Sequence, residues 1–313
     1  MNTVTIKNIL HNVVDKWVNT FLQDYSVSDE PQNIEHFMYF KQFLNEFKHK
    51  LKSNIIISGG ALTSLFLDEE VNDYDIYFTD SSIINNIRNF YLEIYNRKQV
   101  HDDEQKWQWS EKFNCLYRLK HKNYELLNET ELYNNWEKYV ETTDALTSKF
   151  ISEKEGEYIP ICITPNAISL TNKIQLITRF TGTPEKILSN FDFIHTNNYY
   201  KFDTNELVTN KKSLESILTK QLIYNGSKYP ICSLIRTRKF IQRGWNVSAA
   251  EYLKMAFQIK ELDLYDLNIL REQLIGVDAK YFIKFLEELK KYNSFEEIDI
   301  FKLLDEIFEE VGE

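Results

Sequence analysis

Hydrophobic and polar positions alternate along the first quarter of the chain with two distinct periods. Residues 3–24 and 32–51 carry apolar side chains at helical spacing, which predicts two amphipathic helices. The isoleucines at 55–57 form a short apolar, β-branched run that predicts a buried strand. Residues 61–67 return to helical character, and residues 74–78 predict a second strand. The pattern therefore indicates a strand–turn–helix–strand unit that follows a pair of helices.

The middle of the chain is richer in strand patterns. A helix over 82–95 and a polar helix over 123–141 are expected around an exposed, charged turn at 101–104. Alternation and β-branching then predict a series of strands, among them the segment around Phe-Asp-Phe. These strands are expected at residues 148–152, 157–164, 167–171, 173–180, 191–195 and 199–202, with a short helix at 185–189.

A change of composition near residues 224–227, Tyr-Asn-Gly-Ser, predicts a turn or linker. Helices follow, beginning at Pro230 and continuing at residues 248–260, 264–275, 278–291 and 295–311. We therefore expect an α/β (α+β) protein in which a mixed-sheet domain over residues 1–224 precedes a helical domain over residues 225–313.

The strand–turn–helix–strand unit carries the residues with the clearest chemistry. Gly59 and Gly60 allow the backbone to approach a phosphate closely, and the N–H groups at a helix start favour anions. Asp73 and Asp75 are separated by one residue at the start of a strand, so their side chains share a face. Carboxylates are the ligands that Mg²⁺ prefers, with phosphates and water completing its shell. A divalent cation and a triphosphate are the expected ligands. The alternative is that the two aspartates only begin a strand.

This arrangement resembles the signature of the DNA polymerase β-like nucleotidyltransferase superfamily, in which Gly-Gly or Gly-Ser precedes an Asp-apolar-Asp strand. The resemblance implies a polymerase β-like core, a nucleoside triphosphate substrate, and Mg²⁺ or Mn²⁺ bound by Asp73 and Asp75. It also implies that the turn and the following helix hold the triphosphate through Ser58, Gly59, Gly60 and Ser64.

The superfamily uses a third carboxylate from a later strand. The segment at residues 163–195 resembles a block found in nucleotidyltransferase-like proteins of phages and large viruses, which makes Asp192 the expected third metal ligand. Asp144 and Glu157 are weaker substitutes. Alternatively, Asp192 ends a strand or pairs with Arg179. His195 is expected to be structural.

One basic cluster stands out in the helical half. Arg236, Lys239 and Arg243 fall on one face of the helix that starts at Pro230, with Arg238 beside them. Such side chains suit phosphate, so Arg236 and Lys239 are candidates to support the triphosphate or contact a nucleic-acid backbone. The alternative is a surface stripe paired with the acidic C-terminal helices.

Composition narrows the class of protein. The 313 residues include 37 basic and 47 acidic ones, a net charge of −10, which disfavours a generally basic nucleic-acid binder. No apolar run is long enough to span a membrane, the N-terminus lacks secretory features, and the 3 cysteines are scattered, so a cytoplasmic protein is expected. Abundant Asn, Lys and Ile with few Gly and Ala are typical of an AT-rich genome such as a phage's.

We expect a metal-dependent nucleotidyltransferase that moves a nucleoside monophosphate from an NTP to an acceptor hydroxyl, with an RNA or tRNA 3′ end as the first candidate. The tRNA CCA-adding enzymes, the closest familiar analogy, carry Arg-Asp where this chain has Thr63 and Ser64, which weakens that particular assignment. The alternatives are nucleotidylation of a protein or small molecule, and a non-catalytic nucleotide-binding module that kept the fold. The oligomeric state is left open.

Overall fold

The computed structural model describes residues 1–28, 34–99, 105–120, 140–148, 156–264, 266–274, 302 and 305. By their internal contacts, the residues form two compact units. The first comprises Met1–Ser189 and Thr196–Asn210, and the second comprises Asn190–His195 and Lys211–Glu313. The chain thus passes between the units three times. The boundary expected near residue 224 stays a prediction.

The first unit is built on a large mixed sheet of eight strands, in the order β11-β10-β1-β2-β9-β8-β7-β6. Neighbouring strands are antiparallel, except that β2 and β9 run parallel. The strands are β1 (Ile55–Ser58), β2 (Tyr74–Phe78), β6 (Leu146–Thr147), β7 (Pro160–Ile163), β8 (Ala167–Leu170), β9 (Ile174–Thr181), β10 (Tyr199–Lys201) and β11 (Glu206–Val208). A separate small sheet contains β3 (Gln108–Ser110), β4 (Cys115–Leu119) and β5 (Val140–Thr143).

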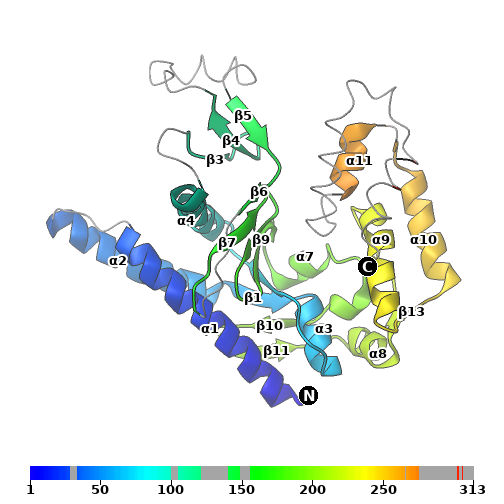
Figure 1. Cartoon of the computed structure of the whole chain (residues 1–313). Helices are drawn as coiled ribbons and strands as arrows, with labels where there is room; N and C mark the ends of the chain where they lie inside the picture. Colours follow the sequence, from blue (N-terminus) through cyan, green and yellow to red (C-terminus); the bar gives the residue numbers. More distant parts are fainter. Residues whose placement is uncertain are drawn as a thin grey trace. The chain divides into compact units, whose positions relative to one another are not determined.

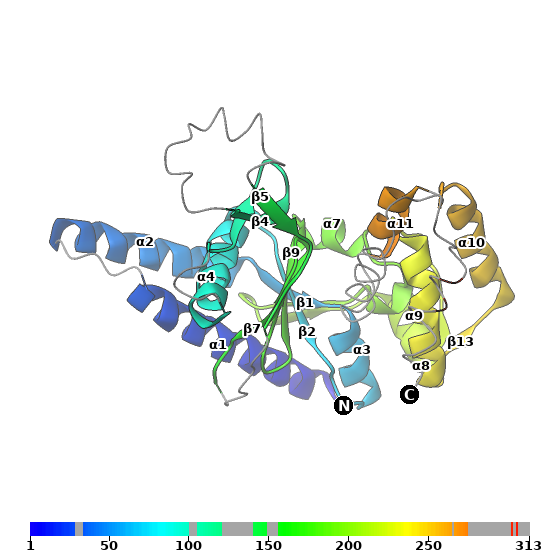
Figure 2. The same ribbon diagram turned by 45° about the horizontal axis from the view of Figure 1, so that its top comes forward.

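Helices cover one side of the large sheet. These are α1 (Thr3–Ser28), α2 (Ile34–Ser53) and α4 (Ser82–Gln99), which lie on the same side of the strands in both views (Figures 1 and 2). Trp17 of α1 is fully buried, and its Nε1 donates a hydrogen bond of 2.9 Å to the hydroxyl of Tyr91 on α4. The shorter helices α3 (Gly60–Leu67) and α7 (Pro184–Leu188) complete the unit.

The register of the central strands places a row of buried apolar side chains on one face of the sheet. Ile57, Ile76, Leu176 and Ile168 are successive partners across β1, β2, β9 and β8, and all four are completely buried. This row belongs to the hydrophobic core that the helices cover. Because side chains alternate along a strand, the neighbouring positions on each strand project to the opposite face.

The second unit is mainly helical. It contains α8 (Lys211–Thr219), α9 (Pro230–Gln242), α10 (Ala249–Lys260) and α11 (Leu267–Leu274), with a parallel pair of short strands, β12 (Gln221–Leu222) and β13 (Asn246–Val247). The expected α/β class, with a mixed sheet followed by helices, is confirmed. No helix in the described part of the chain has the length and hydropathy needed to cross a bilayer.

Most predicted elements match within a few residues, but the strand expected at 191–195 is wrong. Phe193 makes only an isolated bridge to Tyr224, and the backbone turns into a 3₁₀ helix, η2 (Ile194–Thr196). The helix expected at 123–141 lies outside the described residues except for its last two, which belong to β5. The strand at 148–152 and the last two predicted helices also fall almost wholly outside them.

Candidate functional site

Hydrogen bonds of the Ser58 side chain fix the end of β1. Ser58 is completely buried, and its Oγ donates a hydrogen bond of 2.6 Å to the main-chain oxygen of Asn198, just before β10. The same hydroxyl lies 3.3 Å from the main-chain oxygen of Thr196. The Ser58 side chain therefore fixes the start of the turn through protein contacts, and its predicted contact with a triphosphate stays a prediction.

Gly59 forms the turn from β1 into α3. Its φ of 86° and ψ of −147° belong to a region that residues with a Cβ rarely adopt. A Cβ added at Gly59 would lie only 3.0 Å from Oδ2 of Asp75, whereas one added at Gly60 would meet no atom within 4 Å. The glycine therefore allows the Asp75 carboxylate to sit directly against the turn.

The two aspartates lie where the sequence placed them. Asp75 is half-buried on β2 and is the register partner of Ser58 on β1, while the exposed Asp73 immediately precedes the strand. Asp75 projects from the face opposite the buried row formed by Ile57, Ile76, Leu176 and Ile168. The structure thus brings the carboxylate of Asp75 to the first turn of α3, and Asp73 lies two residues earlier, just before the strand. The face that Asp73 is expected to share with Asp75 stays a prediction.

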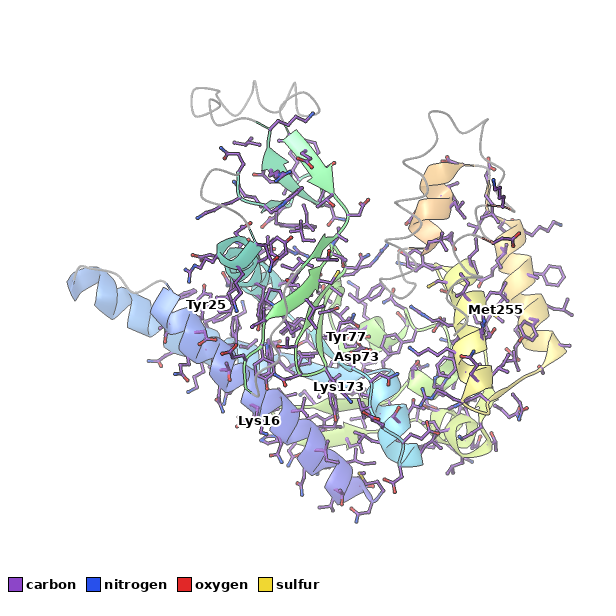
Figure 3. All side chains as sticks on the ribbon, viewed as in Figure 1. Lys16, Tyr25, Asp73, Tyr77, Lys173 and Met255 are labelled. Carbon is purple, nitrogen blue, oxygen red and sulfur yellow. The ribbon has the colours of Figure 1, made fainter. Side chains whose placement is uncertain are left out.

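Lys173 immediately precedes β9 and lies near Asp73, as the two labels in Figure 3 show. Its Nζ donates to the carboxylate of Glu70 at 2.7 Å and to the main-chain oxygen of Val71 at 2.9 Å. The bond to Glu70 is the main cause that raises the pKa of Lys173, and the negative charge of Asp73 acts in the same direction. The Lys173 side chain therefore stabilises the loop that precedes Asp73 through its contacts with Glu70 and Val71.

Ser64 lies in α3, one turn after the glycines. Its side chain is 4% exposed, and that of the neighbouring Thr63 is fully buried. The main-chain oxygen of Ser64 accepts a hydrogen bond of 2.8 Å from the N–H of Glu69, which helps to end the helix. Burial places Ser64 within the packed helix, and its expected contact with phosphate stays a prediction.

Asp192 belongs to the second unit, and it does not lie on the strand that was expected at residues 191–195. Its Oδ2 accepts a hydrogen bond of 2.7 Å from Nη1 of Arg236, which belongs to the same unit. Its main-chain oxygen accepts from the N–H of Asn225 at 2.8 Å. The role of Asp192 as a third metal ligand stays a prediction.

The basic residues of α9 are mostly exposed. Arg236 is held by Asp192, although 43% of its side chain is exposed, and Lys239 lies one turn further along at the surface. The helix ends just before Gly244, which has a φ of 78° and whose N–H donates to the main-chain oxygen of Ile241. The second unit thus presents a basic helix face, and the predicted contacts of Arg236 and Lys239 with phosphate stay predictions.

His195 is a core residue of the second unit. Its ring is fully buried and lies 4.6 Å from the ring of Phe240 and 4.7 Å from that of Trp245, measured between centroids. Burial lowers the pKa of His195 to about 3; Asp192 opposes this shift and Arg243 adds to it. The imidazole is therefore neutral at pH 7, which fits the structural role expected for it.

Gln175 was missed by sequence reasoning. It is the register partner of Asp75 on the parallel strand β9, so it lies next to the carboxylate on the polar face. The alternation of residues 173–180 is a signal that could have placed Gln175 on a polar face, but no sequence pattern showed that β9 pairs with β2. Within the described ranges, no group of three or more His, Cys, Asp or Glu side chains is arranged to hold a metal ion.

Comparison with known proteins places the chain in a family. Residues 32–220, more than half of the sequence, match the Gad2 family, described as Gabija anti-defense 2 family protein. The chain belongs to the Gad2 family. A Gad2 protein, Gabija anti-defense 2 of Bacillus phage SPbetaL7, is 23% identical over 270 residues, which cover 85% of this chain and 52% of that protein. The chain thus spans about half the length of this curated Gad2 relative.

Several solved structures are weakly similar to this Gad2 family member. A tRNA-processing enzyme with CTP has a TM-score of 0.35 and 13% identity, covering 82% of this chain and 55% of that one. The Thermotoga maritima CCA-adding enzyme complexed with tRNA has a TM-score of 0.36 and 12% identity, covering 86% and 53%. A similarity of this size does not extend to activity or ligands.

Proposed function

We propose that this Gad2 family member is a metal-dependent nucleotidyltransferase. The observation that carries the proposal is the position of the Asp75 carboxylate, against Gly59 at the start of α3. Phosphate groups bind at helix N-termini through unpaired backbone N–H groups, and the glycine leaves room for their approach. A carboxylate next to such a site must be offset by a cation before a triphosphate can bind there.

The donor set fits a hard divalent cation. Asp73 and Asp75 would hold Mg²⁺ or Mn²⁺, because Mg²⁺ is commonly bound by one or two carboxylates together with substrate phosphates and water. When bound, such an ion neutralises phosphate charge. The glycine turn and the first turn of α3 would orient the triphosphate. In the reaction, an acceptor hydroxyl oxygen forms a bond to the α-phosphorus and loses its proton, while the bond to the β-phosphate oxygen breaks and releases pyrophosphate.

An RNA or tRNA 3′ end is the first acceptor that we propose, with a protein or small-molecule hydroxyl as the alternative. Incubation with each α-labelled NTP, Mg²⁺ or Mn²⁺, and cellular RNA or protein tests transfer and acceptor together. We expect label in a nuclease-sensitive product with the wild type and none with Asp73→Ala/Asp75→Ala. A protease-sensitive product would instead identify a protein acceptor. Equal labelling by both enzymes would exclude these aspartates from the site.

The name of the phage relative points to a biological role, counteracting the Gabija defence. We propose that nucleotidyl transfer serves this role. Expression in Gabija-bearing cells, followed by phage challenge, tests the connection. We expect the wild type to restore phage growth and the double alanine variant to fail at equal protein levels. Full protection of the phage by the variant would show that the anti-defence role does not require the carboxylates of Asp73 and Asp75.

A binding module without turnover is the second candidate function. It is favoured by one observation: among the residues that the structure describes, no group of three or more His, Cys, Asp or Glu side chains is arranged to hold a metal ion. Such a module would bind NTP in a metal-dependent way without releasing pyrophosphate. Equilibrium binding of an NTP, measured beside pyrophosphate release, distinguishes the two candidates.

A further inference from the structure

We propose that the side-chain amide of Gln175 occupies the third position of the site and contributes its oxygen to the bound cation. This inference rests on the proposed function and concerns the same two aspartates. Its basis is a polar row that crosses the sheet: Ser58 on β1, Asp75 on β2, Gln175 on β9 and Ser169 on β8. Register partners on adjacent strands project to the same face, so Gln175 flanks Asp75 on the side away from Ser58.

The position of Gln175 follows from the strand pairing. Asp75 and Gln175 are register partners, and paired strands lie about 4.8 Å apart. The residues on either side of Gln175, Ile174 and Leu176, are 2% and 0% exposed, which fixes the phase of the strand. Gln175 itself is half-buried. Its side chain therefore leaves the sheet on the same face as the Asp75 carboxylate.

A hydrogen bond to Ser169 fixes the orientation of the Gln175 side-chain amide. Nε2 of Gln175 donates a hydrogen bond of 3.2 Å to Oγ of Ser169, on the strand that lies away from Asp75. With the amide nitrogen used in this way, Oε1 is the end available to act as a ligand. Amide oxygens are suitable ligands for hard cations such as Mg²⁺ and Ca²⁺. Ser169 therefore acts as the positioning residue for Gln175.

A neutral oxygen at this position changes the electrostatics of the site. Two carboxylates and one amide bring two negative charges instead of three, so the site without a cation carries less repulsion. It also attracts a cation less strongly, which makes cation binding depend more on the phosphates of the substrate. We expect the free protein to bind Mn²⁺ weakly and to bind it more tightly when an NTP is present.

Mn²⁺ titration of the full chain, followed by electron paramagnetic resonance without nucleotide, tests the inference directly. Gln175→Glu adds a carboxylate of the same length, and we expect it to tighten Mn²⁺ binding about tenfold or more. Gln175→Leu removes the oxygen and should weaken binding about tenfold. Ser169→Ala should weaken binding to a smaller degree by releasing the amide. Gln221→Glu, an exposed strand position in the second unit, adds the same charge and should match the wild type.

The inference is wrong if Gln175→Glu and Gln175→Leu bind Mn²⁺ like the wild type while Asp75→Asn loses the ion. Thermal unfolding of each variant shows whether it is folded; if Gln175→Glu does not fold, Gln175→Leu and Ser169→Ala make the same comparison. The titration measures cation binding without turnover, so it tests the role of Gln175 separately from the proposed nucleotidyltransferase activity. The expected order of affinities without any label transfer would support the site and contradict the enzyme activity.

Discussion

At the scale of single residues, the absence of a Cβ at Gly59 matters twice. It permits the backbone conformation of the turn, and it leaves room for the Asp75 carboxylate on which the proposed chemistry depends. Gly59→Ala places a Cβ at a φ of 86° and 3.0 Å from the Asp75 carboxylate. We expect the free energy of unfolding to fall by about 1–3 kcal/mol, because this backbone region is essentially restricted to glycine. We also expect NTP transfer to be lost, because Asp75 is displaced. Denaturant unfolding and the label-transfer assay measure the two effects.

Gly60→Ala is the matched control for this prediction. An added Cβ meets nothing within 4 Å there, and the residue is the first of α3. Its unfolding free energy should be unchanged or higher by up to about 1 kcal/mol. Equal stability of the two alanine variants would contradict the close approach of Asp75 to the turn.

His195 predicts a dependence of stability on pH. Its pKa is about 3 in the folded protein and about 6.5 when unfolded, so the unfolded chain binds more protons between these values. The free energy of unfolding should therefore fall as the pH is lowered from about 6.5 towards 3, by up to about 1.4 kcal/mol per unit. Denaturant unfolding at pH 7 and pH 4.5 measures this fall. In His195→Phe the fall should be smaller, and an identical fall in both proteins would show that His195 is not its source.

At the scale of elements, the Asp192–Arg236 pair joins the segment at 190–195 to α9 within the second unit. Arg236→Ala leaves the carboxylate of Asp192 buried, with 9% of its side chain exposed, and without this partner. We expect a loss of about 1–3 kcal/mol in unfolding free energy, towards the low end because solvent screens the half-exposed arginine.

Arg238→Ala, on an exposed position of the same helix, is the control and should stay within about 0.5 kcal/mol of the wild type. Chemical denaturation of the wild type, Arg236→Ala and Arg238→Ala measures the unfolding free energies. Equal values would mean that the Asp192–Arg236 pair does not stabilise the fold, and the exposed Arg236 would then be better explained as a ligand-binding residue.

The elements also show what the sequence can and cannot predict. The turn at Gly59 and the strand with Asp75 were predicted correctly, because glycine conformation and strand periodicity are local properties. The pairing of Asp75 with Gln175 was not, since parallel strands so distant in sequence leave no local pattern. Alternation of Phe191 and Phe193 predicted a strand, but tertiary contacts decided otherwise: Phe193 packs against Tyr224 and Phe240, and the backbone turns immediately afterwards.

At the scale of the whole molecule, a Gad2 family member combines an acidic chain with a local basic helix. The net charge of −10 makes broad attraction to nucleic acid unfavourable, so any polynucleotide contact would have to be confined to surfaces such as that of α9. The match to the Gad2 family covers residues 32–220, which include the four strands β1, β2, β9 and β8.

The central claim is that Asp75 acts in nucleotidyl transfer, and pyrophosphate release tests it most directly. Wild type and Asp75→Asn are compared with each NTP, Mg²⁺ or Mn²⁺, and cell extract as the source of acceptor. Asparagine keeps the shape of the side chain and removes its charge. We expect pyrophosphate release by the wild type and a reduction of at least about a hundredfold in the variant, with unfolding free energy little changed. Undiminished release by Asp75→Asn would contradict the account.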